Sequence, residues 1–308
     1  MQLYRYLSSL KRASRSGRAV TIGAYDGVHV GHRVILSTLK QKALSLEGPA
    51  MVVSFEPMPR EFFAPVNPPA RLTRFREKFE CLAALDIDEL FCPPFSAVRD
   101  LSPDAFIREL LVDGLGVRHI VVGDDFRFAA GRIGGIEDLE RAGQTFGFGV
   151  TAVPGVYHGE QRISSTEIRL ALKAGDLETA RGMLGRAYSM SGKVVRGLGL
   201  GRDLGFPTAN VCLSRRQTPV DGIFAARVLG LSGQPLDGVA SVGTRPTVGG
   251  EKPLLEVHIF DFDRDIYGEY ITVQFVERLR EERKYSDLES LVAQMHDDVS
   301  AARAVLAA

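Results

Sequence analysis

The sequence contains no tryptophan, only three cysteines and no excess of either charge. Cys81, Cys92 and Cys212 lack the spacing of metal ligands and cannot all form pairs, so we expect reduced thiols and a cytoplasmic location. The 38 basic side chains balance the 38 acidic ones, which argues against a general nucleic-acid-binding protein. The balance still allows a local basic pocket for one anionic small molecule.

Long apolar runs are absent as well. No stretch is long enough to span a bilayer, so we expect no membrane association. The first 18 residues, MQLYRYLSSLKRASRSGR, lack the apolar core of a signal peptide. What is present is a chain of 308 residues with 45% hydrophobic content, enough for one large globular domain or two medium ones.

Strand-like and helix-like runs alternate up to about residue 185. Strands are predicted at 18–23, 50–55, 119–123 and 149–153, and helices at 31–46, 73–85, 102–115, 136–144 and 164–174. Ser102 before Pro103 is typical of a helix start, and Ser164 with Glu167 fits a capping box. This alternation predicts a parallel sheet covered by helices on both faces.

The pattern changes after Leu184, where strand-like runs follow one another without helices. These runs lie at 188–195, 223–229, 238–242, 254–260 and 270–276. A closing amphipathic helix is predicted, capped by Ser286 with Glu289, and its apolar face comprises Leu288, Leu291, Val292, Met295 and Val299. We therefore predict an α/β domain at 1–185 and a small antiparallel β-barrel with a closing helix at 186–308.

The stretch GAYDGVHVGH, residues 23–32, lies where the first predicted strand meets the first long helix. Such junctions bind ligands in α/β proteins, and a helix N-terminus suits phosphate. His29 and His32 could donate hydrogen bonds to a phosphate that gains charge. The alternatives are that both are polar residues of a helix cap, or that they bind zinc, for which no further ligand lies nearby.

Several motifs resemble known enzymes. Residues 23–32 resemble the H-x-G-H signature of nucleotidylyltransferases, and ISSTEIR (163–169), VSFEPMPREFF (53–63) and VVGDDFRF (121–128) are similar to motifs of the FMN adenylyltransferases. GRDLGFPTAN (201–210), DGIFAARV (221–228), SVGTRPTVGG (241–250) and LEVHIFDFDRDIYG (255–268) resemble riboflavin kinase. The resemblance covers nearly the whole chain and is to the prokaryotic bifunctional riboflavin kinase/FMN adenylyltransferase family. Tyr25, Ala129 and Tyr285 depart from it, standing where Phe, Gly and Phe are usual.

For the first half, the resemblance implies a Rossmann-like nucleotidylyltransferase domain in which the FMN phosphate attacks the α-phosphate of ATP. It implies that His29, His32 and Arg169 are catalytic. The implied ATP contacts are Gly23, Asp26, Gly31, Ser164, Ser165 and Thr166, and the implied flavin contacts are Phe55, Pro57, Asp125, Phe126 and Phe128. From the residues alone, SSTE could be only a helix cap, Arg169 could be solvated, and Phe62, Phe63, Phe126 and Phe128 could pack in the core.

For the second half, the resemblance implies phosphorylation of riboflavin with MgATP. Gly199, Gly201, Gly205 and Pro207 would contact ATP, Thr208 and Asn210 would bind ATP and Mg²⁺, and Glu256 would take the proton of the riboflavin hydroxyl. Glu256 alone is also compatible with an outward strand residue between Leu255 and Val257. A class I aminoacyl-tRNA synthetase and a non-catalytic flavin sensor are the rival functions, and the expected partners are small molecules, with neither nucleic acid nor membrane.

Overall fold

The computed structural model describes residues 1–10, 17–197, 200–247 and 250–307. The chain forms two compact units: the first comprises Met1–Pro69 with Thr73–Ser164, and the second comprises Ala70–Leu72 with Ser165–Ala308. The residues between 165 and 185, which the sequence pattern places with the first half, share contacts mainly with the second unit. A functional boundary at 185/186 stays a prediction.

The first unit contains a six-stranded sheet with the order β1-β4-β3-β2-β5-β6, in which every pairing is parallel. Its strands are β1 (Gln2–Tyr4), β2 (Arg18–Ile22), β3 (Ala50–Val53), β4 (Glu89–Phe91), β5 (Val117–Gly123) and β6 (Gly149–Val153). The parallel sheet was predicted; β1 and β4 were not, because three residues are too few to show a pattern.

Helices and short turns connect these strands. They are α1 (Val30–Ser45), α2 (Pro59–Phe63), α3 (Phe75–Ala83), α4 (Pro103–Ala105) continuing as a π-helix (Phe106–Gly114), α5 (Ile136–Phe146), and 3₁₀ turns at Leu7–Ser9, Phe95–Ala97 and Ala130–Arg132. A small antiparallel ribbon, β7 (Tyr157–His158) with β8 (Gln161–Arg162), precedes the end of the unit. The predicted cap is confirmed, since the Ser102 side chain accepts from the N–H of Ala105.

Both faces of the sheet are covered, because neighbouring strand residues enter two different hydrophobic clusters. Val20 and Val53 belong to one cluster, whereas Ala19 and Val52 belong to the other. Strand β2 lies between β3 and β5: the chain continues to β3 and β4 on one side of it and later to β5 and β6 on the other. The carboxyl ends of β2 and β5 therefore form the topological switch point, where open α/β sheets bind ligands.

The second unit contains a closed antiparallel barrel with the order β10-β13-β12-β11-β14-β9. Its strands are β9 (Ser189–Val195), β10 (Ala209–Cys212), β11 (Gly222–Leu229), β12 (Leu236–Thr247), β13 (Gly250–Ile259) and β14 (Tyr270–Arg280), and its helices are α6 (Ser165–Ala174), α7 (Leu177–Leu184), α8 (Leu200–Asp203) and α9 (Leu288–Ala307). The barrel and the closing helix were predicted. Helix α7, strand β10 and the short helix α8 were not.

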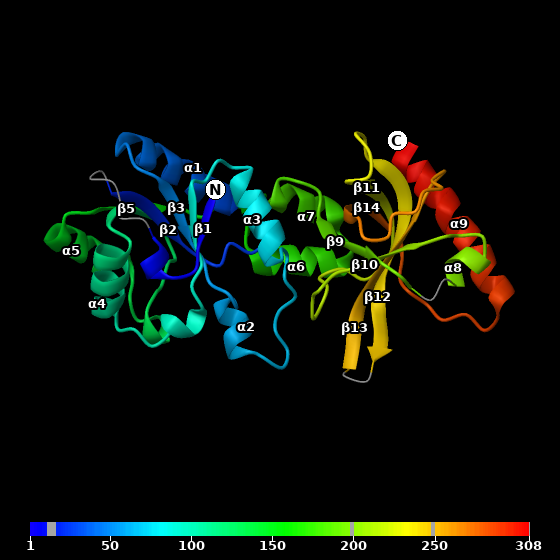
Figure 1. The fold of residues 1–308 in the computed structure, drawn as a ribbon, viewed down its shortest axis with the longest axis horizontal. Helices are drawn as coiled ribbons and strands as arrows, with labels where there is room; N and C mark the ends of the chain where they lie inside the picture. The colour runs from blue at the N-terminus through cyan, green and yellow to red at the C-terminus, as the bar shows by residue number, and fades with distance from the viewer. Residues whose placement is uncertain (11–16, 198–199, 248–249, 308) are drawn as a thin grey trace. The chain divides into compact units, whose positions relative to one another are not determined.

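Helix α9, red in Figure 1, packs on β11, β12 and β14. Ala225 on the barrel and Ala302 on the helix belong to one buried hydrophobic cluster. Two details of the predicted helix are wrong. Asp287, not Ser286, caps it, because Asp287 directly precedes the first helical residue and accepts from the N–H of Ser290 at 2.8 Å. Leu288 lies in the first turn and is 59% exposed, so it is not part of the apolar face.

Candidate active sites

The histidine turn, residues 23–32, joins β2 to α1 at the switch point. His29 occupies the N-cap of α1, and its Nδ1 accepts from the backbone N–H of His32 at 3.3 Å. The two imidazole rings stack with centroids 3.6 Å apart, and the Tyr25 ring lies 4.7 Å from His32. The structure thus brings the two predicted histidines together, and the helix-cap alternative holds for His29 at the same time.

Two glycines of the histidine turn, Gly23 and Gly31, leave room for aromatic rings beside them. A Cβ on Gly31 would lie 3.3 Å from the His29 ring and 3.9 Å from the carbonyl oxygen of Ile163, and a Cβ on Gly23 would lie 3.0 Å from the Tyr25 ring. Gly27 has a φ of +85°, the left-handed region that favours glycine. The contact with Ile163 also shows that the backbone leading into the ISSTEIR motif passes beside the histidine turn.

Asp26 ties the histidine turn to the start of α3. It is buried, and its Oδ1 accepts from the N–H of Thr73 at 2.9 Å, while the N–H of Gly27 donates to Thr73 Oγ1 at 2.9 Å. These bonds satisfy buried polar groups, so Asp26 has a structural role. Its contact with ATP stays a prediction.

The electrostatics of the histidine turn favour a neutral ring at His32. Loss of solvent lowers the pKa of His32 well below its ordinary value of 6.5, and the nearby His29 and Lys78 lower it further. His32 Nδ1 is buried with no hydrogen-bond partner among the described residues, so the neutral ring carries its proton on Nε2, where it leaves no buried donor unpaired. Burial raises the pKa of Tyr25, which keeps the phenol neutral.

The predicted flavin-side residues divide between core and surface. Phe55 and Phe128 belong to the hydrophobic core, with Phe126 partly buried against it, so core packing explains part of this set. Asp125 lies at the end of β5, with Oδ1 3.4 Å from Arg162, and Pro57 follows the end of β3. Phe63 is 71% exposed, which contradicts the core interpretation of that residue.

Ser165, Thr166 and Arg169 lie on α6 in the second unit, and Ser164 is the last residue of the first. Arg169 is half-buried rather than solvated: its Nε donates to the carbonyl of Ala70 at 2.6 Å, and its Nη1 donates to the carbonyl of Ser165 at 2.9 Å. The guanidinium therefore fixes the first turn of α6. Its contact with phosphate stays a prediction.

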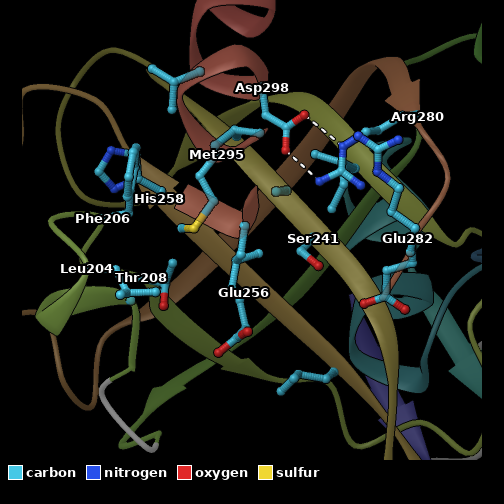
Figure 2. A pocket seen from close by; sticks show the side chains of 18 of the residues that line it. Leu204, Phe206, Thr208, Ser241, Glu256, His258, Arg280, Glu282, Met295 and Asp298 are labelled. Carbon is cyan, nitrogen blue, oxygen red and sulfur yellow. Dashed lines mark hydrogen bonds and ion pairs between the residues drawn. The ribbon is translucent and has the colours of Figure 1, made fainter. Parts of the chain in front are cut away.

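The second unit contains a cavity of about 440 Å³ between the barrel and α9. Glu256 on β13 lines it, opposite Ser241 on β12 and Asn210 on β10 in the strand register. Figure 2 shows the Glu256 side chain between those of Thr208 and Glu282. Leu255 and Val257 are buried, so Glu256 does alternate with core residues, and the face to which it points is the cavity wall.

The structure describes only some of the glycines that the resemblance assigns to ATP contacts. Gly199 lies outside the described residues. A Cβ on Gly201 would lie 2.5 Å from the carbonyl of Phe206 and 3.2 Å from Thr208 Oγ1. Gly205 has a φ of +86°, which favours glycine. The carbonyl of Pro207 lies 2.9 Å from His258 Nδ1. Thr208 lines the cavity.

Asn210 is placed differently from Thr208. A Cβ on Gly197 would lie 2.3 Å from Asn210 Nδ2, so this carboxamide packs against a glycine at the end of the neighbouring strand. Its backbone position opposite Glu256 still puts the two side chains on one face of the sheet. Within the described residues, no group of three or more His, Cys, Asp or Glu side chains is arranged to hold a metal ion.

Sequence reasoning missed four charged residues of this cavity, Arg280, Glu282, Arg283 and Asp298. Arg280 donates to Asp298 through Nε at 2.8 Å and Nη2 at 2.7 Å, which joins the end of β14 to α9 (Figure 2). Glu282 lies over Gly243, where a Cβ would be 2.3 Å from Oε1. Burial raises the pKa of Glu282, as do Asp221 and Glu256, whereas Arg280 opposes them.

The available signal for these residues was weak. Arg280 and Glu282 belong to the charged run LREERK between a strand and a helix, and such runs are usually solvated.

No described helix combines the length and the apolar character needed to cross a membrane.

Comparison with known proteins assigns both halves of the chain. The FAD synthetase family model matches residues 11–167, and the riboflavin kinase family model matches residues 184–306. The bifunctional riboflavin kinase/FMN adenylyltransferase of Escherichia coli strain K12 is 45% identical over 304 residues, covering 98% of this chain and 97% of that protein. The protein of the same name from Pseudomonas fluorescens is 45% identical over 309 residues, covering 100% and 98%.

A solved structure shares the fold over both units. It is a crystal structure from Streptococcus pneumoniae named as a macrolide-efflux protein, with a TM-score of 0.80 and 28% identity over 98% of each chain. The function in its title differs from the function in the names of the curated relatives. The two family models and the near full-length relatives agree with each other. The chain therefore belongs to the bifunctional riboflavin kinase/FMN adenylyltransferase family, with the FAD synthetase in its N-terminal part and the riboflavin kinase in its C-terminal part.

Proposed function

We propose that the histidine turn is the centre of adenylyl transfer. An oxygen of the FMN phosphate attacks the α-phosphorus of ATP, the new P–O bond forms, and the bond to pyrophosphate breaks. The phosphate nucleophile is already ionised at neutral pH, so the site needs hydrogen-bond donors rather than a base. The observation that carries this proposal is the stacked pair His29 and His32 at the switch point of the sheet.

Each histidine would donate from Nε2. His29 Nδ1 already accepts from the N–H of His32, so its proton also lies on Nε2 when the ring is neutral. Gly23, Gly31 and the N-terminus of α1 would face the phosphates of ATP. The set proposed for the remaining ATP contacts is Asp26, Ser164, Ser165, Thr166 and Arg169, and the set proposed for the flavin is Phe55, Pro57, Asp125, Phe126 and Phe128.

We propose that riboflavin binds in the cavity beside Glu256 and is phosphorylated there. Here the nucleophile is a neutral hydroxyl, so a base is required: Glu256 takes the proton while the riboflavin 5′-oxygen bonds to the γ-phosphorus and ADP leaves. The cavity has an apolar wall that would accept a flavin ring, formed by Ile223, Val239, Ala240, Leu254, Leu291, Met295 and Val299. Gly199, Gly201, Gly205 and Pro207 are proposed to contact ATP.

Thr208 and Asn210 offer a hydroxyl and a carboxamide oxygen, the hard donors that Mg²⁺ prefers. We propose that they hold the Mg²⁺ that arrives with ATP. When bound, this ion neutralises charge on the phosphates. The cytoplasmic location expected from the cysteines stays a prediction.

The test is to supply each substrate separately. With riboflavin and MgATP the protein is expected to form FMN and then FAD, and with FMN and MgATP it is expected to form FAD and pyrophosphate, both measured by chromatography. A folded protein that binds flavin but yields neither product would support the sensor alternative. Fragments beginning at residues 165 and 186 locate the boundary: FMN formation by only the longer one would contradict a kinase domain of 186–308.

A further inference from the structure

Lys78 on α3 is a buried cation that the sequence gives no reason to single out. Its side chain is 1% exposed, although lysine is almost never fully buried in proteins. Its Nζ donates to the carbonyl of Ala24 at 2.8 Å and to Ser54 Oγ at 3.1 Å. Ser54 Oγ donates to the same carbonyl at 3.2 Å. The ammonium therefore lies directly beneath the histidine turn.

The bond to Ala24 fixes a backbone that is unusually bent. Ala24 precedes Tyr25, whose φ is +50° and whose ring packs on His32, and Val28 has a φ of +41°. Non-glycine residues in this region require surrounding structure to hold them. Thr73 holds the turn at Asp26 and Gly27, so the segment 73–78 clamps the turn near both sides of Tyr25.

The charge of Lys78 acts on the histidines as well. The charged or titratable groups that act on His32 are His29, from the N-cap of α1, and Lys78, from α3, and both disfavour its protonation. Tyr25, whose ring lies 4.7 Å from that of His32, stays neutral because burial raises its pKa. An imidazolium at His32 would be repelled by Lys78 and would weaken the stack on His29, whereas a neutral ring remains in place with its Nε2–H available.

We propose that Lys78 is a positioning residue for adenylyl transfer: it clamps the histidine turn through Ala24 and Ser54, and its charge keeps the stacked imidazoles in their place. The inference rests on the proposed roles of His29 and His32. With 1% exposure the ammonium cannot reach a substrate, so Lys78 acts only through the turn.

Three full-length variants test the inference. Lys78→Met removes the charge and the donors, Lys78→Arg keeps the charge, and Lys40→Met removes a half-buried lysine paired with Asp86 as the matched control. FAD formation from FMN is measured from pH 5.5 to 8.5, with FMN formation from riboflavin as the internal reference. The protonation of His32 is followed by NMR, with its signal assigned by comparison with His32→Gln.

We expect Lys78→Met to lower kcat for FAD formation by about 10- to 100-fold, the loss that a small misplacement of catalytic groups produces, with a smaller change in KM. His32 should become protonated at a higher pH than in the parent protein, so the acid limb of the rate profile moves to higher pH. In Lys78→Arg the titration of His32 should stay as in the parent, and Lys40→Met should match the parent in every measurement.

Two results would overturn the inference. One is a Lys78→Met protein whose FAD formation and pH profile equal those of the parent; the other is loss of activity with an unchanged titration of His32, which would reveal a purely structural lysine. If Lys78→Met does not fold, the NMR titration of His32 in the parent protein still tests the proposal. A His32 whose pKa lies near the ordinary value of 6.5 is incompatible with it. Failure of the proposed function looks different, because FAD formation would then survive removal of His32 itself.

Discussion

The two candidate sites differ in the polar groups proposed to act on the substrates, imidazoles in one and a carboxyl group in the other. The histidine turn combines two stacked imidazoles with the buried ammonium of Lys78, and the surroundings keep His32 uncharged. The cavity of the second unit instead contains the carboxyl groups of Glu256 and Glu282, and its surroundings raise the pKa of Glu282.

Under the proposed functions, the difference follows the nucleophile that each site would handle. In adenylyl transfer, the FMN phosphate brings its own negative charge, so donors that stabilise the phosphorus centre are sufficient. In riboflavin phosphorylation, the hydroxyl must lose a proton, so a carboxylate is needed beside it. Two ATP-dependent reactions in one chain therefore call for opposite polar groups, and this contrast can be tested one residue at a time.

The largest expected effect is at Glu256. Glu256→Gln keeps size and polarity but removes the base, so FMN formation from riboflavin should fall by about 10²- to 10⁴-fold, the usual contribution of such catalysis. FAD formation from supplied FMN should be unchanged. Glu277→Gln is the matched control, because Glu277 is an exposed barrel residue on β14. Near-parental FMN formation by Glu256→Gln would mean that the carboxylate is not the base.

The histidine turn should give the reciprocal result with a smaller effect. His29→Ala and His32→Ala each remove one donor, which typically costs about 10²- to 10³-fold in rate. FAD formation should fall by that factor while FMN formation remains at the parent rate. His119→Gln serves as the control because His119 lies near the opposite end of β5, where it bonds to Thr151. Loss of both activities in a folded variant would show that the two sites are coupled.

Asn210→Ala separates metal binding from base catalysis within the cavity. If the carboxamide holds Mg²⁺, FMN formation at limiting Mg²⁺ should fall by about tenfold, equivalent to about 1.4 kcal/mol of binding free energy. Added Mg²⁺ should then restore the rate of Asn210→Ala but leave Glu256→Gln inactive. A Mg²⁺ titration of both variants measures this, and equal Mg²⁺ dependence of Asn210→Ala and the parent would remove Asn210 from the proposed ligands.

The sequence predicted the architecture because apolar periodicity reports burial directly. The run Arg18–Ile22 is buried throughout, as a central parallel strand must be, and His29 and His32 follow it at a recognisable helix start. Pairings across long sequence separations were not predictable. Arg169 bonds to the carbonyl of Ala70, 99 residues earlier, and this partner leaves no local signal.

Buried charge was the other failure of prediction. Lys78 lies in REKFE, a segment whose composition indicates a solvated helix face, and only the packing of α3 beneath the histidine turn buries the ammonium. Arg280 with Asp298 shows the same limitation, since neither residue differs locally from other charged residues of LREERK or of α9. A sequence reports which side chains can bear charge, whereas the tertiary contacts decide which of them are enclosed.

The smallest expected effect concerns the stability of the first unit. Ala129 has φ of +64° and ψ of −178°, a region essentially restricted to glycine. Relief of that strain, about 1–3 kcal/mol, exceeds the added backbone entropy of the unfolded chain, about 0.4–1 kcal/mol. Ala129→Gly should therefore stabilise the first unit by about 1 kcal/mol.

The measurement that resolves this effect is thermal inactivation of the two activities in one sample. Because Ala129 belongs to the first unit only, FMN formation should be lost at the parent temperature with Ala129→Gly. FAD formation also uses residues of α6 in the second unit, so it should survive to a temperature a few degrees higher when the first unit is the less stable of the two. The matched control is Ala105→Gly, where φ is −64° and ψ is −42°. In that helical conformation glycine costs about 0.5–1 kcal/mol, so the shift should be downward. Equal shifts of both activities would mean that the two units unfold together, and a downward shift for Ala129→Gly would mean that the residue at 129 is held by its contacts rather than strained by its backbone.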